Sequence, residues 1–109
     1  MNQYDESIDD TFSSPFLKAA DLPDEGLAVE ISEVDFQIFG KGADREKKPI
    51  LSLDGHNKML VLNKTNARTI AKVVGSPRYA EWVGKRITLV RADVEFAGDM
   101  VEAIRVKSR

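Results

Sequence analysis

The sequence contains no cysteine and only one histidine, His56. Without cysteine the chain can form neither disulfides nor thiolate metal sites, and it offers no cysteine nucleophile. With one histidine and no cysteine, the chain has no second such residue to complete a metal site or a nucleophile–base pair. Because His56 follows an Asp-Gly turn, we expect it to be an exposed hairpin residue. These absences argue against an enzyme and against any metal or cofactor.

Long apolar runs are missing as well. No stretch approaches the roughly 18 apolar residues of a membrane span. The first ten residues, MNQYDESIDD, carry neither the positive leader nor the apolar run of a secretory signal. We therefore expect a cytoplasmic setting with no membrane partner. With 109 residues, 42% of them hydrophobic and 31% charged, the composition is that of one globular domain.

Positive charge is nearly absent from the first 40 residues, which hold Lys18 against ten acidic residues, a net charge of −9. The other residues hold fifteen Lys and Arg against eight Asp and Glu, a net charge of +7. Such asymmetry favours a polyanion such as nucleic acid as partner. The alternative is an ordinary solvated surface with an acidic solubility tail.

Residues 1–13 are acidic and polar, which predicts a disordered arm. Such an arm would compete with nucleic acid for a basic surface, and thereby act as an autoinhibitor, or it would recruit a basic replication or recombination protein. Residues 14–23, bounded by two prolines, predict a short helical turn that packs on the domain.

Alternating apolar residues predict five strands. They are residues 27–39, 50–53, 58–62, 85–95 and 100–106. The first strand changes its alternation near Ser32 and Glu33, which predicts a bulge. Asp54 and Gly55 predict a hairpin turn between the second and third strands. Residues 40–48 lack a large apolar side chain and predict a mobile loop.

One helix is expected between the third and fourth strands. Ala67, Ile70, Ala71 and Val74 have the spacing of one helical face, and Gly75 ends the pattern. Five strands with a helix between the third and fourth is the order of the oligonucleotide/oligosaccharide-binding (OB) fold. We therefore predict a mainly β protein in which residues 14–109 form a five-stranded OB-type barrel.

Four stretches of the sequence resemble small OB-fold proteins encoded by bacteriophages and prophages. They are residues 14–22 (SPFLKAADL), 60–67 (LVLNKTNA), 82–89 (WVGKRITL) and 103–106 (AIRV). The resemblance covers most of the chain beyond residue 13 and includes no catalytic signature. It implies a protein that binds single-stranded DNA during phage replication or recombination.

Cations and aromatic rings near the expected OB groove are the candidate nucleic-acid ligands. In OB barrels this groove crosses strands 2 and 3, and the loops between strands 1 and 2 and between strands 4 and 5 border it. Cations there bind phosphates of DNA or RNA without sequence preference, and rings stack on bases. The candidates are Phe39, Lys41, Arg45, Lys47, Lys48, Lys58, Arg86, Arg91, Phe96 and Arg105.

Other aromatic and charged residues are expected outside the site. Phe36 fits the inward phase of its strand and is expected in the core, while Tyr79 and Trp82 are expected to plug one end of the barrel. The helix cations, Lys64, Arg68 and Lys72, are expected to face solvent.

Two other functions stay open at this point. The first is a protein-interaction or structural module with no nucleic-acid ligand, in which the barrel contacts another phage or host protein. The basic loop would then be only a polar hairpin connection, in which Asp44 and Glu46 halve the net charge. The second is a metal-dependent enzyme that uses the carboxylates of the last hairpin, although such carboxylates are commonly only solvated. These carboxylates are Asp93, Glu95, Asp99 and Glu102.

Overall fold

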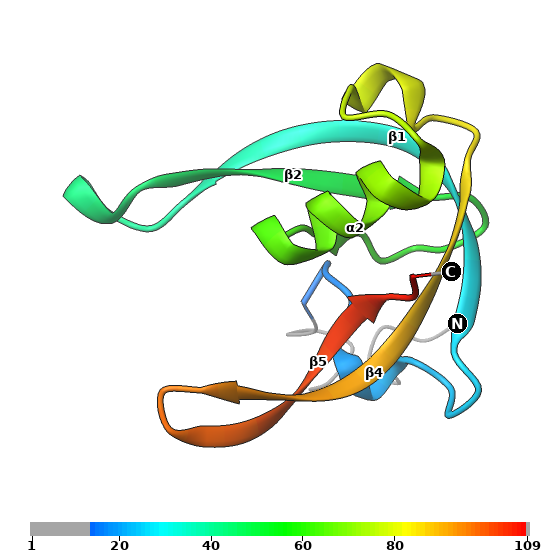
Figure 1. Ribbon diagram of the computed structural model, residues 1–109. Helices are drawn as coiled ribbons and strands as arrows, with labels where there is room; N and C mark the ends of the chain where they lie inside the picture. Colours follow the sequence, from blue (N-terminus) through cyan, green and yellow to red (C-terminus); the bar gives the residue numbers. More distant parts are fainter. Residues whose placement is uncertain (1–13, 109) are drawn as a thin grey trace, which may run out of the picture.

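The computed structural model describes residues 14–108, which form one curled antiparallel sheet with one α-helix (Figure 1). The predicted acidic arm, residues 1–13, lies outside the described residues. The strands are β1 (Leu27–Phe39), β2 (Glu46–Leu53), β3 (Leu60–Val61), β4 (Arg86–Phe96) and β5 (Asp99–Val106). The helix, α2 (Lys64–Val74), follows β3. The mainly β class, the five strands and the position of the helix are confirmed.

The sheet is open. Its strand order is β3-β2-β1-β4-β5, and among the described residues no pairing between the edge strands β3 and β5 closes it into the predicted barrel. One reason is the length of β3, which has two residues instead of the expected five. A strand this short offers too few backbone groups to pair with a second neighbour along its other side.

Strand β1 belongs to both halves of the sheet. Residues 27–30 pair with β4, and residues 31–39 pair with β2. The register with β2 shifts between Ile31 and Glu33, so the predicted bulge is confirmed. Because a bulge bends its strand and increases the local twist, β1 can change partner there and curl the sheet around one core.

The core lies inside this curl, against one face of α2. Its buried members come from the sheet, from the helix, from the segment after the helix and from the segment before β1. Among them are Leu22, Val29, Ile31, Leu51, Leu53, Leu60, Leu62, Ile70, Trp82, Ile87 and Leu89. Trp82 is buried as expected, and its indole Nε1 donates a hydrogen bond to the carbonyl oxygen of Ser76 at 2.8 Å.

Both ends of α2 follow from local sequence. The Asn63 side chain accepts a hydrogen bond from the backbone N–H of Asn66 at 2.8 Å and caps the first turn. Gly75 ends the helix with a φ of 81°, which costs glycine little because it has no Cβ. Within residues 14–108, no helix is both long and apolar enough to cross a membrane.

The loop predicted over residues 40–48 is wrong in its second half. β2 begins at Glu46, and Lys47 and Lys48 pair with Ile38 and Gln37 of β1. Only residues 40–45 connect the strands, with a short 3-10 turn, η3 (Gly42–Asp44). The apolar pattern could not predict this part of the strand, because its side chains are charged and do not pack on the core. Strand pairing needs only the backbone groups.

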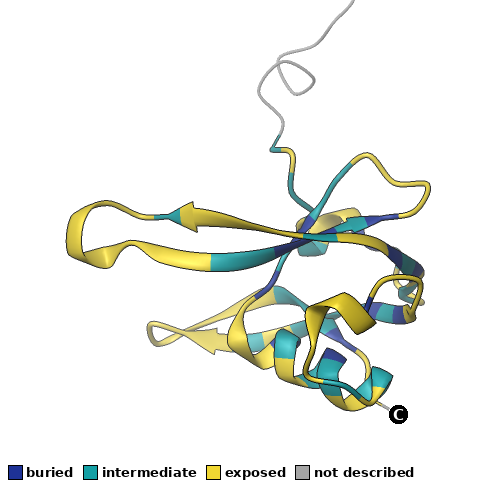
Figure 2. Cartoon of the chain, turned by 90° about the horizontal axis from the view of Figure 1, so that it is seen from above, coloured by how far each residue is buried: buried dark blue, intermediate teal, exposed yellow. Residues whose placement is uncertain are grey.

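Two hairpins extend beyond the core. We call residues 36–49 the β1–β2 arm and residues 93–102 the β4–β5 arm. The second ends in a tight turn at Ala97 and Gly98, which both have positive φ, as favoured hairpin turns require. In both views the arms project past α2 in the same direction, and most of their residues are exposed (Figures 1 and 2).

Residues 14–22 cross the opening between the sheet edges. Leu17 donates its backbone N–H to the Met59 carbonyl oxygen, and Met59 donates its N–H to the Pro15 carbonyl oxygen. The segment then forms the predicted short turn, η2 (Ala19–Asp21), which packs against β4 and β5. It thus connects the β3 side of the sheet with the β5 side.

Asn66 joins the helix to the other sheet edge. It is only 3% exposed, and its side-chain amide donates to the Ile104 carbonyl oxygen at 2.9 Å. Its side-chain oxygen accepts a hydrogen bond from the backbone N–H of Val106 at 3.3 Å. Asn66 therefore forms hydrogen bonds with two backbone groups of β5 that have no partner in a neighbouring strand.

Replacing this side chain should destabilise the fold. In Asn66→Ala the Ile104 carbonyl and the Val106 N–H lose their partners, and each unpaired buried group costs about 1–3 kcal/mol. We expect the free energy of unfolding, measured by urea titration, to fall by about 2–4 kcal/mol. The matched change Asn57→Ala, at an exposed position, should have little effect; an equal loss in both variants would contradict this role.

Candidate nucleic-acid interface

The structure divides the ten predicted binding residues among three places. Phe39, Lys41, Arg45, Lys47 and Lys48 lie on the β1–β2 arm, Phe96 lies at the end of the β4–β5 arm, and Lys58, Arg86, Arg91 and Arg105 lie on the body of the molecule. The predicted set is therefore not brought together as one site. The five residues of the β1–β2 arm are the part that stays together.

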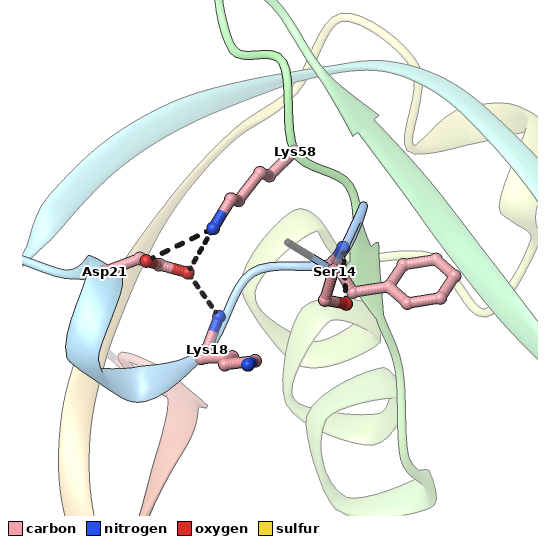
Figure 3. A network of polar contacts seen from close by, with 5 residues as sticks. Ser14, Lys18, Asp21 and Lys58 are labelled. Carbon is pink, nitrogen blue, oxygen red and sulfur yellow. Dashed lines mark hydrogen bonds and ion pairs between the residues drawn. The ribbon is translucent and has the colours of Figure 1, made fainter. Parts of the chain in front are cut away.

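Two of the predicted cations pair with carboxylates of the segment before β1. Lys58 forms an ion pair with Asp21 at 3.3 Å, and Arg91 forms one with Asp24. Figure 3 shows the Asp21 carboxylate between the Lys58 ammonium and the backbone N–H of Lys18, which donates to it at 2.8 Å. Lys58 and Arg91 thus already have anionic partners within the chain.

The aromatic residues of β1 differ from the expectation. Phe36 is 40% exposed and not in the core, because β1 continues past the buried part of the sheet. Phe39, the expected stacking platform, is half-buried, and its ring meets the Phe16 ring edge-on at 5.9 Å between centroids. The Lys48 ammonium lies 5.9 Å from the Phe39 centroid. Phe36 therefore offers more free ring surface than Phe39.

Three aromatic rings form a row from the core to the β1–β2 arm. Trp82 is buried, and the Tyr79 ring contacts it edge-on with 4.8 Å between ring centroids. The Phe36 ring in turn contacts the Tyr79 ring edge-on with 5.2 Å between centroids. Tyr79, expected to plug the barrel end with Trp82, is 38% exposed. The Lys47 ammonium lies 4.8 Å from the centre of the Phe36 ring. Exposed aromatic surface and positive charge thus occur together.

Two neighbouring pockets lie beside α2, one between the helix and the β1–β2 arm and the other between the helix and residues 77–82. One, of about 310 Å³, includes Lys47, Lys48 and Pro49, and the other, of about 240 Å³, includes Arg68 and Pro77. Both pockets are also lined by Lys64, Ala67 and Tyr79. We call the two together the α2 groove.

The α2 groove is positively charged. Among its lining residues are four cations, contributed by β2 and α2, and one carboxylate, that of Glu46. Glu46 lies 4.0 Å from the Lys48 ammonium. This distance is longer than the 3.3 Å between Lys58 and Asp21, and the Glu46 side chain is 69% exposed. Such an ion pair contributes little free energy, so Lys48 stays available to another anion. The groove can hold an anionic ligand that also has a flat, apolar part.

No family model, curated protein or solved structure matches this chain. The candidate interface therefore rests on the geometry of the chain itself. Sequence reasoning missed Phe36, Tyr79, Lys64 and Arg68 as members of it. One signal was present: β1 has thirteen residues, more than a small barrel needs, so its outer residues had to leave the core.

The carboxylates of the last hairpin are spread along the β4–β5 arm. Asp93 faces Glu102 in the register, Glu95 faces Met100, and Asp99 faces Phe96. In the part of the chain that the structure describes, no three potential metal ligands are grouped as a metal site would require.

The Asp21 contact should make stability depend on pH. The backbone N–H of Lys18, and then the ammonium of Lys58, lower the pKa of Asp21 below its ordinary value, against the opposing effect of partial burial. A carboxylate with a lowered folded-state pKa stabilises the fold above its unfolded pKa, and this contribution is lost as pH falls through the folded pKa. Asp21→Asn should therefore be less stable than the unaltered protein near neutral pH.

The difference between the two proteins should vanish in acid, once Asp21 is protonated. Urea unfolding at a series of pH values would measure it. Asp54→Asn, which changes an exposed aspartate of a turn, is the matched control. A stability difference for Asp21→Asn that stays constant down to acid pH would show that the Asp21 charge does not hold the segment.

Proposed function

We propose that the protein binds single-stranded nucleic acid, DNA in the first place, without sequence preference, and that the strand lies in the α2 groove. One observation carries this proposal. The exposed rings of Phe36 and Tyr79 lie beside a groove whose walls carry Lys47, Lys64 and Arg68. Rings that stack on bases and cations that contact phosphates are the two elements of sequence-tolerant binding to single strands.

The size of the groove supports a strand as ligand. Each pocket is open and close to or below about 300 Å³, the lower end of the range for small-molecule sites. The successive nucleotides of an extended strand fit such a groove better than one large enclosed ligand does. Duplex DNA fits less well, because its bases are stacked on one another and cannot stack on protein rings.

Lys47 is the residue that would move on binding. Its ammonium lies near the Phe36 ring in the structure, and an exposed cation–π contact contributes about 0.5–1 kcal/mol. A base stacked on an aromatic ring contributes about 1–3 kcal/mol. A base can therefore displace the ammonium from the ring, and the freed cation can then contact the adjacent phosphate.

The order of the strands and the helix supports the interpretation of the sheet as an OB-type fold. In OB folds the loops between strands 1 and 2 and between strands 4 and 5 border the ligand, and these connections correspond here to the two arms. We propose an open form of the OB barrel, in which residues 14–22 and Asn66 take the place of direct pairing between β3 and β5. The resemblance to phage and prophage proteins favours a role in replication or recombination.

Removing the aromatic faces should weaken binding. Phe36→Leu and Tyr79→Leu keep an apolar side chain but lose the flat ring, so each should raise the dissociation constant for labelled oligo-dT roughly 5-fold to 100-fold. Fluorescence anisotropy measures this constant, and circular dichroism checks the fold. Val83→Ala, at an exposed apolar position that does not line the groove, is the control. Unchanged affinity in both leucine variants would place the strand elsewhere.

Removing cations should change the salt dependence. We compare three serine variants: the arm set at Lys41, Arg45, Lys47 and Lys48, the groove pair at Lys64 and Arg68, and a control pair at Lys85 and Lys107. Each lost phosphate contact should reduce the slope of log affinity against log salt by about 0.7. We expect shallower slopes for the arm set and the groove pair but not for the control pair. Equal slopes in all three variants would contradict the proposed site.

A further inference from the structure

The two arms carry opposite charge. The β1–β2 arm has four cations against two carboxylates, and the β4–β5 arm has four carboxylates and no cation. Both arms also expose apolar side chains. Phe96 is 71% and Met100 66% exposed on the β4–β5 arm, and Ile38 is 52% exposed on the β1–β2 arm. Each arm therefore exposes apolar side chains beside a net charge of one sign.

One face of the β4–β5 arm is mainly apolar, with Asp99 at its end, and the other carries Asp93, Glu95 and Glu102 together with Met100. Residues that face each other in an antiparallel register point to the same side, and successive residues alternate between sides. The pairs Val94–Val101 and Ala92–Ala103 therefore share one side with Phe96. On the other side Asp93 lies directly opposite Glu102, and like charges so placed destabilise a strand pair. A cationic partner would relieve this repulsion.

A second copy of the chain supplies the matching surface. The β1–β2 arm carries Lys41, Arg45, Lys47 and Lys48 together with the exposed side chain of Ile38. Because both arms project in the same direction (Figures 1 and 2), a two-fold rotation brings two molecules together arm to arm. In that arrangement the β1–β2 arm of each molecule meets the β4–β5 arm of the other.

We propose that the protein forms a two-fold dimer in which the β1–β2 arm of each copy binds the β4–β5 arm of the other. Such an interface contains each charge contact twice and closes after two copies, so it does not continue into a filament. Lys47 and Lys48 also line the α2 groove, so the dimer covers part of the proposed nucleic-acid surface. The test below uses no nucleic acid, and its outcome is independent of the proposed function.

Charge reversal tests the pairing. One variant changes the acidic side: Asp93→Lys, Glu95→Lys, Asp99→Lys and Glu102→Lys. A second variant changes the basic side: Lys41→Glu, Arg45→Glu, Lys47→Glu and Lys48→Glu. In each variant alone both arms carry net charge of the same sign, so the arms of two copies repel each other. Sedimentation velocity at low salt should then show only the mass of one chain. The unaltered protein under the same conditions should show twice that mass.

An equimolar mixture of the two variants should restore the dimer, because each arm of one variant then meets an arm of opposite sign. Raising the salt from about 0.01 to 0.15 M shortens the Debye length from about 30 to 8 Å, so the fraction of unaltered dimer should fall. A monomeric unaltered protein at low salt, or a mixture that stays monomeric, would overturn the proposal.

A milder change keeps the test valid if a charge-reversed chain does not fold. Phe96→Ser keeps every charge and removes the most exposed apolar side chain of the β4–β5 arm, so it should raise the dimer dissociation constant. Val83→Ser, which changes an exposed apolar residue outside both arms, should leave that constant unchanged. Equal dissociation constants for Phe96→Ser and the unaltered protein would contradict an interface at this arm.

Discussion

The bend in β1 is the constraint on which the rest of the structure depends. At the point where the strand leaves β4 and joins β2, Ile31 faces Leu53 of β2, and its backbone groups bond to the segment before β4. Its N–H donates to the Lys85 carbonyl oxygen, and its carbonyl oxygen accepts from the Gly84 N–H. The Glu30 carbonyl oxygen accepts from the Asp54 N–H. Backbone groups freed by the bulge thus keep partners, and Ile31 itself stays fully buried.

The bend also decides where exposed surface arises. The strands on both sides of it are longer than the core, so their outer residues form two arms with no further layer of protein against them. On the β1–β2 arm this leaves Phe36 beside Tyr79 and Lys47, and on the β4–β5 arm it leaves Phe96 and Met100 beside carboxylates. One geometric cause, strand length beyond the core, underlies both the proposed nucleic-acid groove and the proposed dimer interface.

Local signals predicted the elements well wherever a few neighbouring residues decide the backbone. The glycine at position 75 and the phase change near Ser32 both act within one or two turns of chain, and both are found where they were expected. The errors have a common origin. Residues 46–48 and Phe36 belong to strand beyond the core, where charged and apolar side chains are both exposed and the alternation of burial no longer holds.

The sequence by itself determined the strand and helix content, the bulge, the asymmetric distribution of charge and the basic character of the β1–β2 connection. Only the tertiary structure decided that Lys58 and Arg91 are paired with Asp21 and Asp24, that the sheet stays open, and that Lys64 and Arg68 lie near Tyr79. The physical reason is that these contacts join residues far apart in the chain. Their geometry depends on the direction in which the bend sends each strand, and no local pattern encodes that direction.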